Sequence, residues 1–156
     1  MAASGGTPLI RRATAHDVPG IVALLADDDL GRGREDNTPQ ALPAYLAAFE
    51  QMASDRYQLP VVLELEGQIA GYFQLTFIPG LSRRGMWRGL IESVRIAKAR
   101  RGAKLGEAMM LFAIEECRGR GCGLVQLTTD KTRDDAHRFY ERLGFSATHD
   151  GMKLTL

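Results

Sequence analysis

The sequence has few of the residues that cross-link a small protein or bind a metal ion. It contains two cysteines, Cys117 and Cys122, and three histidines that lie far apart at positions 16, 137 and 149. Neither a Cys-x-x-Cys nor a His-x-x-x-His spacing occurs, so the sequence favours neither a zinc site nor a disulfide framework. We expect both cysteines to be packed thiols, because free cysteine is usually buried.

Long apolar runs and an excess of one charge are also missing. No stretch approaches the ~20 apolar residues that a membrane span needs, and the start of the chain lacks the basic and apolar regions of a signal peptide. A formal net charge of +1 excludes a general electrostatic attraction to nucleic acid or anionic lipid. These absences predict a cytoplasmic protein with no membrane partner and no nucleic-acid partner.

What the sequence does contain is the ordinary composition of a globular domain. The 156 residues are 45% hydrophobic and 25% charged, enough for one buried core. No repeat and no low-complexity linker interrupts them. We expect a flexible N-terminus over 1–7 and a single domain over 8–156.

The periodicity of the apolar residues predicts the element order β-α-α-β-β-β-α-β-α-β-β. The fold class is therefore α/β (mixed α+β). Thr14 is expected to cap the first helix with the help of Asp17, and Thr38-Pro39 to open the second. The expected strands cover 9–11, 61–65, 69–78, 86–97, 124–128, 145–148 and 152–156, and the expected helical stripes cover 18–25, 42–53, 105–117 and 136–143.

The segment 91–106 carries the strongest functional signal, because a strand runs through a glycine-containing turn into a helix. The first N–H groups of a helix have no internal partner and lie at its positive dipole end, which makes a site for phosphate. Glycines at 102 and 106 would let the backbone approach a ligand closely. Basic residues gather in this segment: Arg95, Lys98, Arg100, Arg101 and Lys104. We interpret it as a phosphate site, with a solvated charged turn as the alternative.

The spacing of the glycines disfavours two common phosphate ligands. A nucleoside triphosphate loop needs Gly-x-x-x-x-Gly-Lys-Ser/Thr, which is not found over 102–106. The dinucleotide fingerprint belongs after a first strand, whereas the glycines at 119, 121 and 123 follow a helix. We interpret those three glycines as a helix stop.

Two segments together resemble a known family. Arg101-Gly102-Ala103-Lys104-Leu105-Gly106 resembles the coenzyme A pyrophosphate loop of the GNAT N-acetyltransferase family, which usually reads Arg-Gly-x-Gly-Ile/Leu-Gly/Ala. Residues 136–145 are similar to the family's Ala-x-x-Phe-Tyr-x-x-x-Gly-Phe segment. There are two departures: Lys104 replaces the middle glycine, and Arg133 stands where many members carry an asparagine that contacts the cofactor.

The resemblance implies a sheet splayed between its fourth and fifth strands, with the pantetheine arm of acetyl-coenzyme A (acetyl-CoA) held between them. Backbone groups of Val94 and Ile96 would bond that arm, and the 101–106 loop would hold the pyrophosphate. The cofactor-binding residues expected on this basis are Val94, Arg95, Ile96, Arg101, Gly102, Ala103, Lys104, Leu105, Gly106, Arg133 and Tyr140.

Acetyl transfer from a thioester requires an aligned neutral amine, a base for its proton and help for the leaving thiolate. Tyr140 matches the tyrosine of the family motif and is the candidate general acid, with a plain core tyrosine as the alternative. Glu92 stands where many relatives place an acid facing the acceptor. It is the candidate base, acting directly or through water, with a salt bridge to a nearby arginine as the alternative.

Strand alternation makes a further prediction for the same segment. It places Glu92, Val94 and Ile96 on one face of the strand, with Ser93 and Arg95 on the other. A carboxylate on a buried face would be costly without a role or a partner. We therefore expect Glu92 to be buried and to have either a role or a partner.

The resemblance implies that the first two helices and the loop over 27–37 form one wall of the acceptor pocket. The aspartates 27–29 suit a cationic amine, and Arg32 and Arg34 suit a carboxylate. Together they indicate a small amino acid or similar zwitterion, with ordinary surface charge as the alternative explanation. Peptide N-termini, polyamines and aminoglycoside antibiotics are alternative acceptors. A non-catalytic acyl-CoA-binding or sensing domain is the alternative to an enzyme. A homodimer is compatible with the last hairpin, which would offer a pairing edge.

Overall fold

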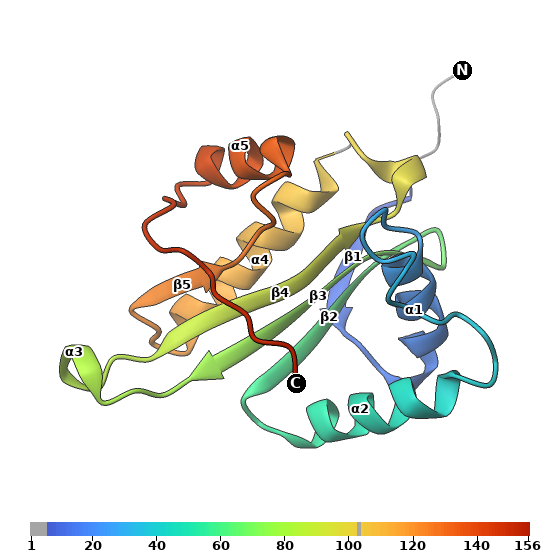
Figure 1. Cartoon of the computed structure of the whole chain (residues 1–156), viewed down its shortest axis with the longest axis horizontal. Helices are drawn as coiled ribbons and strands as arrows, with labels where there is room; N and C mark the ends of the chain where they lie inside the picture. The colour runs from blue at the N-terminus through green and yellow to red at the C-terminus, as the bar shows by residue number, and fades with distance from the viewer. Residues whose placement is uncertain (1–5, 103) are drawn as a thin grey trace.

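The computed structural model describes residues 6–102 and 104–156, so most of the expected flexible N-terminus lies outside it. Figure 1 shows strands and helices in the order that follows. The elements are β1 (Leu9–Arg12), η1 (Ala15–Asp17), α1 (Val18–Ala26), α2 (Leu42–Ser54), β2 (Gln58–Leu65), β3 (Gln68–Ile78), α3 (Ser82–Gly85), β4 (Arg88–Ile96), η2 (Lys98–Arg100), α4 (Leu105–Gly119), β5 (Leu124–Leu127) and α5 (Asp134–Arg142). The mixed α+β class is confirmed.

The strands form one sheet in the order β1-β2-β3-β4-β5. The first four are antiparallel, and β5 pairs parallel to β4. The β2–β3 hairpin turns at Glu66-Gly67, as predicted, and both residues adopt positive φ, which a tight two-residue hairpin requires. β4 therefore has an antiparallel neighbour, β3, on one side and a parallel neighbour, β5, on the other.

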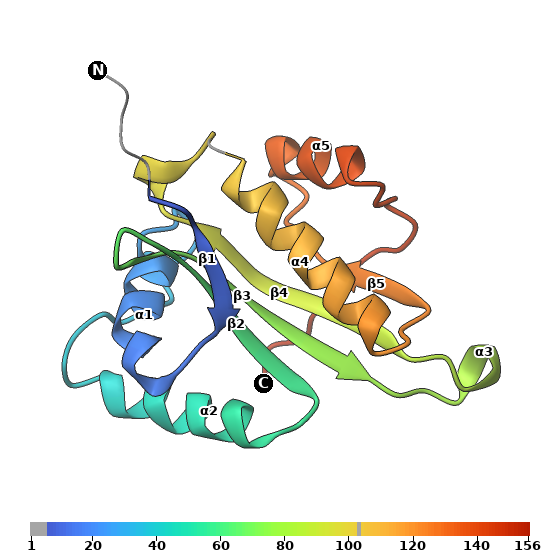
Figure 2. The same ribbon diagram turned by 180° about the vertical axis from the view of Figure 1, so that it is seen from behind.

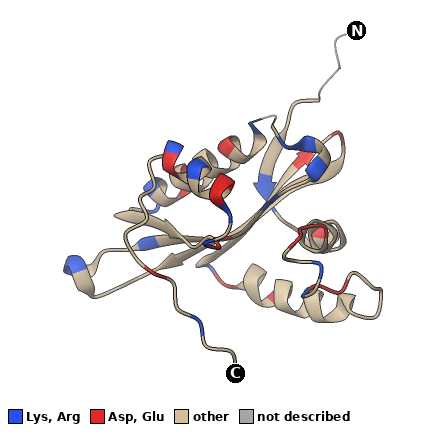
Figure 3. Ribbon diagram, turned by 45° about the horizontal axis from the view of Figure 1, so that its top comes forward, with Lys and Arg blue, Asp and Glu red and all other residues tan. Residues whose placement is uncertain are grey.

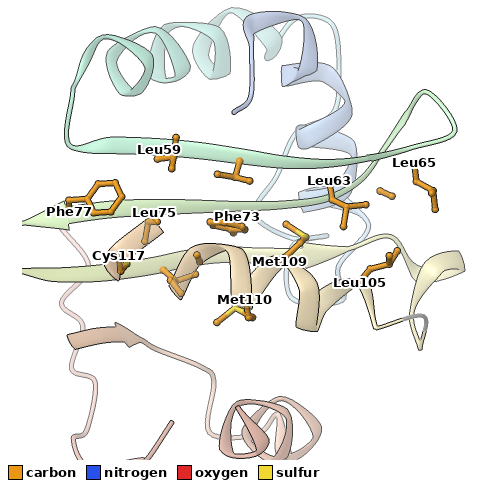
Figure 4. Packing of buried hydrophobic residues seen from close by; sticks show 14 residues of the cluster. Leu59, Leu63, Leu65, Phe73, Leu75, Phe77, Leu105, Met109, Met110 and Cys117 are labelled. Carbon is orange, nitrogen blue, oxygen red and sulfur yellow. The ribbon is translucent and has the colours of Figure 1, made fainter. Parts of the chain in front are cut away.

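Helices cover both faces of the sheet, and alternation along β3 separates two cores. Figure 4 shows α1 and α2 on one side of the strands and α4 on the other. Phe73, Leu75 and Phe77 are directed at α4, where they pack with Met109 and others in the larger cluster. Tyr72 packs on the opposite face in the cluster under α1 and α2. Figure 2 shows α5 beside the start of α4.

The start of α1 is tied to the sheet by a carboxylate. Asp17 accepts hydrogen bonds from the Thr14 backbone N–H at 2.7 Å and from the Thr14 hydroxyl at 3.1 Å, which confirms the predicted cap. Arg11 pairs with Asp17 and with Glu64, at 2.8 Å each. The hydrogen bond from Arg11 lowers the pKa of Asp17 to about 2. The polar end of α1 is thus fixed to both β1 and β2.

Two predictions about element boundaries are wrong. The second helix begins at Leu42 rather than at Thr38-Pro39, and the proline in its first turn is Pro43. The predicted last hairpin is not formed, since no strand occurs over 143–156. Met152 and Leu154 are 94% and 86% exposed. Alternating apolar and polar residues give this segment the period of a strand. A strand forms, however, only where its backbone N–H and C=O groups can pair with the edge of another strand. In the described part of the chain no helix is long and apolar enough to span a bilayer.

The thiols pack against the sheet. Cys117 is 1% exposed on α4, Cys122 is half-buried, and neither is in a disulfide, which confirms the prediction. Burial raises the pKa of Cys117 to about 12. A Cβ atom placed on Gly89 of β4 would lie 2.2 Å from Cys117 Sγ, so α4 can approach β4 this closely only over a glycine.

We therefore expect Gly89→Ala to lower the free energy of unfolding by about 1–3 kcal/mol through overpacking. Urea denaturation measures this. Cys117→Ala should recover most of that loss in the double variant, because the two sites share one contact. Gly119→Ala is the control, since its Cβ meets nothing within 4 Å. Additive effects of Gly89→Ala and Cys117→Ala would contradict this explanation.

Candidate active site

A β-bulge interrupts β4 in the middle of the candidate site. In the pairing with β3, Tyr72 lies opposite Arg95 and Gln74 opposite Glu92, so two residues of β4 face Phe73 alone. The first of them, Ser93, has a φ of 57°. One extra residue in a strand reverses the alternation beyond it and bends the strand.

The predicted alternation is therefore wrong for Glu92, although Val94 and Ile96 share one face and Arg95 lies on the other, as predicted. Glu92 and Arg95 share the face that α1 and α2 cover, because their partners on β3 lie on that face. Val94 and Ile96 pack against the other core, on the side of α4. Glu92 is also exposed rather than buried, and no salt bridge to it occurs in the described structure.

The second half of β4 runs past the end of β5. The pairing with β5 covers Arg88 to Ile91, and β5 ends at Leu127. Within the described residues, 92–96 thus have no β5 partner on that side, as the expected splay requires. The carbonyl oxygen of Val94 accepts a hydrogen bond from Arg95 Nη1 at 2.9 Å. An extended ligand could add to this edge in the manner of a strand.

The turn after β4 leads into the N-terminus of α4. Gly102 has a φ of 84°, and Lys104 stands at the helix N-cap with a φ of 58°. Ala103, which the family resemblance also assigned to the cofactor, lies outside the described residues. Arg101 and Lys104 are exposed beside this helix end. The arrangement offers N–H groups, dipole and two cations to an anion.

Only part of the basic segment is available to such an anion. Arg100 Nη2 lies 2.6 Å from Glu66 Oε2, and Lys98 Nζ lies 3.5 Å from carboxylate oxygens of both Asp27 and Asp29. Among the described residues, Arg101 has no ion pair, and neither has Lys104. The phosphate-site prediction therefore narrows to these two cations at the helix end.

The middle aspartate of the 27–29 run is buried against β4. Arg95 Nη2 lies 3.5 Å from Asp28 Oδ2, and their side chains are 14% and 8% exposed. Asp28 Oδ2 and Arg95 Nε have no hydrogen-bond partner within the described part of the chain. Burial lowers the pKa of Arg95, and Asp28 opposes this. The aspartates expected to face a cationic acceptor are paired with cations of the chain itself.

Tyr140 lies half-buried on α5 among aromatic rings. Its ring centroid is 5.2 Å from that of Phe139 and 6.0 Å from that of Phe145. Burial raises the pKa of Tyr140, while the charges of Arg133 and Arg95 oppose the rise. The phenol therefore carries its proton at neutral pH. The packing role of the ring is confirmed. The hydroxyl group keeps its proton and can therefore donate it.

Gly106 serves the packing of α4 against α5. A Cβ atom on this residue would lie 3.5 Å from the Phe139 ring, an ordinary contact distance. Leu105 is buried in the larger core and anchors the first turn of α4. These two residues hold the helix end in place, so that the exposed members of the 101–106 loop can face a ligand.

The structure thus places the candidate residues in three groups. The described loop residues surround the start of α4, Arg95 and Glu92 share the face of β4 that α1 and α2 cover, and α5 carries Arg133 at its N-cap and Tyr140, which packs against the core on the side of α4. Burial, with a contribution from Glu92, raises the pKa of Tyr72 to about 12. Sequence reasoning missed Asp28 as the partner of Arg95, because a run of acids carries no signal for its partner. In the described part of the chain no cluster of His, Cys, Asp and Glu could hold a metal ion.

A mixed sheet whose bulged, half-unpaired strand runs into an exposed helix end is the arrangement that the family resemblance implies for an acyltransferase. Comparison with known proteins agrees: the description "Acetyltransferase (GNAT) family" matches residues 24–145, and the chain belongs to this family. It is therefore an enzyme of the N-acetyltransferase class.

Three relatives illustrate the similarity. An aminoalkylphosphonate N-acetyltransferase of Salmonella typhimurium is 31% identical over 140 residues, which cover 90% of this chain and 86% of the relative. A glucosamine 6-phosphate N-acetyltransferase of Trypanosoma brucei brucei is 37% identical over 90 residues, which cover 58% and 59%. A crystal structure described as a transcriptional regulator from Bacillus halodurans C-125 superposes with a TM-score of 0.93 at 43% identity, covering 96% of this chain and 100% of that one.

The left-handed backbone at Lys104 generates a stability prediction. We expect Lys104→Gly to raise the free energy of unfolding of the ligand-free protein by about 0.5–1 kcal/mol, because glycine adopts positive φ without a Cβ clash. Urea unfolding measures this. Lys104→Ala is the control, since it removes the charge but keeps the Cβ atom. Equal stabilisation by both variants would assign the effect to charge repulsion instead.

Proposed function

We propose that the protein is an acetyl-CoA-dependent N-acetyltransferase that acts on a primary amine of a small molecule, by direct transfer in a ternary complex. The observation that carries this proposal is a single continuous arrangement. The unpaired edge of β4 over 92–96 leads into the helix end at Leu105, and α5, which carries Tyr140, packs beside that end through Phe139. Thioester, phosphates and leaving group would each meet a suitable part of the chain.

In this proposal the edge of β4 binds the pantetheine arm through backbone groups of Val94 and Ile96. The pyrophosphate contacts backbone N–H groups at the start of α4 and the side chains of Arg101 and Lys104. Such contacts combine a helix dipole with charge-assisted hydrogen bonds. The residues present fit this ligand, because the helix end is exposed and its two cations have no ion-pair partner in the described chain.

The chemical step balances with residues of this chain. The amine nitrogen bonds to the acetyl carbonyl carbon, and the carbon–sulfur bond breaks. The proton of the amine passes through water to Glu92, which is exposed on the face of α1 and α2. Tyr140 donates its proton to the departing thiolate, and both groups then exchange protons with solvent.

The two enzymes among the relatives narrow the acceptor. Their names describe an aminoalkylphosphonate and a glucosamine 6-phosphate as substrates, and both are small amines with an anionic phosphorus group. We propose an acceptor of this kind in place of a simple zwitterion. The pairing of Asp28 with Arg95 supports this choice, because this carboxylate is buried and is not available to bind a cation.

Binding of acetyl-CoA tests the cofactor site directly. Calorimetric titration should show saturable binding of acetyl-CoA and weaker binding of dephospho-CoA and ATP. In Lys104→Glu we expect affinity to fall about tenfold or more at low salt, and by less at high salt because salt screens an exposed charge. Absence of binding to the wild-type protein would refute the cofactor proposal. An unchanged affinity of Lys104→Glu at every ionic strength would refute the loop assignment.

Removal of the phenol tests the general acid. Tyr140→Phe keeps the packing with Phe139 and Phe145 but loses the proton, so we expect kcat to fall about 100-fold, within the usual range for acid–base catalysis. Acetyl-CoA affinity should stay within about twofold, a change that corresponds to under ~0.5 kcal/mol. Turnover is measured by thiol release. Wild-type turnover in this variant would exclude Tyr140 from the mechanism.

The relative described as a transcriptional regulator favours a second candidate, an acyl-CoA-sensing domain on the same fold. A sensing domain would bind acyl-CoA at the same site as the enzyme but would not transfer the acyl group. Acetyl-CoA binding without acetylation of any small amine, in a screen that includes aminoalkylphosphonates, would support sensing over catalysis.

A further inference from the structure

The sheet face that carries Glu92 is covered by helices over only part of its length. Tyr72 of β3 packs in the apolar cluster under α1 and α2. Leu90 of β4 lies further along the same face, is half-buried and belongs to neither apolar cluster. In Figure 1 the C-terminal segment passes in front of the sheet, but Met152 and Leu154 are 94% and 86% exposed, so they do not pack on this face. The part of the face beyond Tyr72 is therefore open.

Two rows of side chains cross this open part of the face. In one row Thr76 of β3 lies between Gln58 of β2 and Leu90 of β4. In the next row Gln74 of β3 lies opposite Glu92 of β4. Residues directly opposite each other in an antiparallel pair point to the same face, with Cα atoms about 4.5–5.5 Å apart. Figure 3 shows that most charged residues lie on helices and loops rather than on the strands. Among these five residues, Glu92 alone carries a charge.

The three polar side chains beside Glu92 form one hydrogen-bonded group. Gln58 Oε1 accepts a hydrogen bond from Gln74 Nε2 at 3.1 Å and another from the Thr76 hydroxyl at 3.0 Å. These two bonds use both lone pairs of the oxygen, and all three side chains are half-buried. The side-chain amide of Gln74 is thus held in place. Within the described residues its carbonyl oxygen and its second N–H form no further hydrogen bond, so a ligand could use both.

The position of Gln74 indicates which chemical group it could bind. Glu92 is the first residue of β4 beyond the pairing with β5, so an amine that enters at this edge meets Glu92 first. Neighbouring strands lie about 4.8 Å apart, which places a group bound by Gln74 within about two or three covalent bonds of that amine. The Gln74 amide is neutral and offers both a donor and an acceptor. A hydroxyl group matches both, whereas an ionised phosphonate only accepts.

We propose that Gln74, held by Gln58, binds a hydroxyl group of the acceptor while Glu92 takes up the proton of its amine. The proposal rests on the proposed function and narrows its substrate class to anionic amines with a hydroxyl on the carbon next to the amine-bearing carbon. Gln58 is a positioning residue, because it contacts Gln74 rather than the substrate. The alternative is a solvated sheet face on which the three polar side chains only bond one another, and it gives no preference for a hydroxyl.

Two acceptors that differ by one hydroxyl test the proposal. The protein is assayed with acetyl-CoA and either 2-amino-1-hydroxyethylphosphonate or 2-aminoethylphosphonate. The wild-type protein should show a kcat/KM about 3- to 10-fold higher for the hydroxylated amine, as for one neutral hydrogen bond. In Gln74→Leu this ratio should fall to within about twofold of unity. Gln68→Leu is the matched control and should keep the wild-type ratio, because Gln68 is exposed at the other end of β3.

Substitution of Gln58 tests its positioning role. Gln58→Leu removes the oxygen that holds Gln74, so the preference for the hydroxylated amine should be lost. Gln58→Glu keeps an accepting oxygen at this place and should keep most of the preference. The ratio compares two acceptors in one preparation, so a smaller folded fraction of a variant lowers both values alike and leaves the ratio unchanged.

Two results would overturn the proposal and leave the enzyme in place. They are equal kcat/KM for both amines in the wild-type protein, and an unchanged ratio in Gln74→Leu. If the wild-type protein acetylates neither amine, calorimetric titration with both amines in the presence of coenzyme A decides. Tighter binding of the hydroxylated amine that Gln74→Leu loses would support the hydroxyl site and reject the enzyme. Equal binding or no binding, in a protein without turnover, would reject both.

Discussion

The extra residue in β4 decides how the rest of the site is arranged. Because the bulge at Ser93 and Val94 reverses the alternation, Arg95 is directed to the face of α1 and α2 and Ile96 to the face of α4. An unbroken strand would send Arg95 into the apolar core under α4, where a guanidinium without a partner would be costly. The bulge instead brings Arg95 to Asp28 at 3.5 Å. The strand, the loop after α1 and the edge left by β5 are then held in one arrangement.

From that arrangement follows a division of the cations into two sets. Arg95, Lys98 and Arg100 face acids of the loop after α1 and of the β2–β3 hairpin, so they fix the ends of the sheet and its helices to one another. Arg101 and Lys104 are left at the start of α4. The charge run that looks like one basic patch in the sequence therefore divides at the end of η2 into cations that form ion pairs and two, Arg101 and Lys104, that form none within the described residues.

Local sequence patterns were enough to predict most helices and strands and the turn over 101–106. They did not predict which residues of different elements contact one another. Helical spacing and the Glu66-Gly67 turn gave α1, α4 and the β2–β3 hairpin, because these signals depend on neighbours in the sequence. The bulge could not be predicted, since Ser93 carries no mark of a positive φ. The partner of Arg95 could not be predicted either, because Asp28 is distant in sequence. The last hairpin failed for the same reason: residues 152–156 have a strand's alternation, and the partner edge was assumed.

The two departures from the family motif have a common physical effect. Lys104 replaces a glycine and Arg133 replaces an asparagine, each immediately before a helix, at α4 and at α5. Each places a full positive charge where a helix dipole already attracts anions. The Lys104 substitution costs backbone strain, because its φ is 58°. A ligand with more negative charge than the N–H groups alone would balance would offset that cost. The pyrophosphate of acetyl-CoA would meet that condition at the start of α4 in the proposed complex.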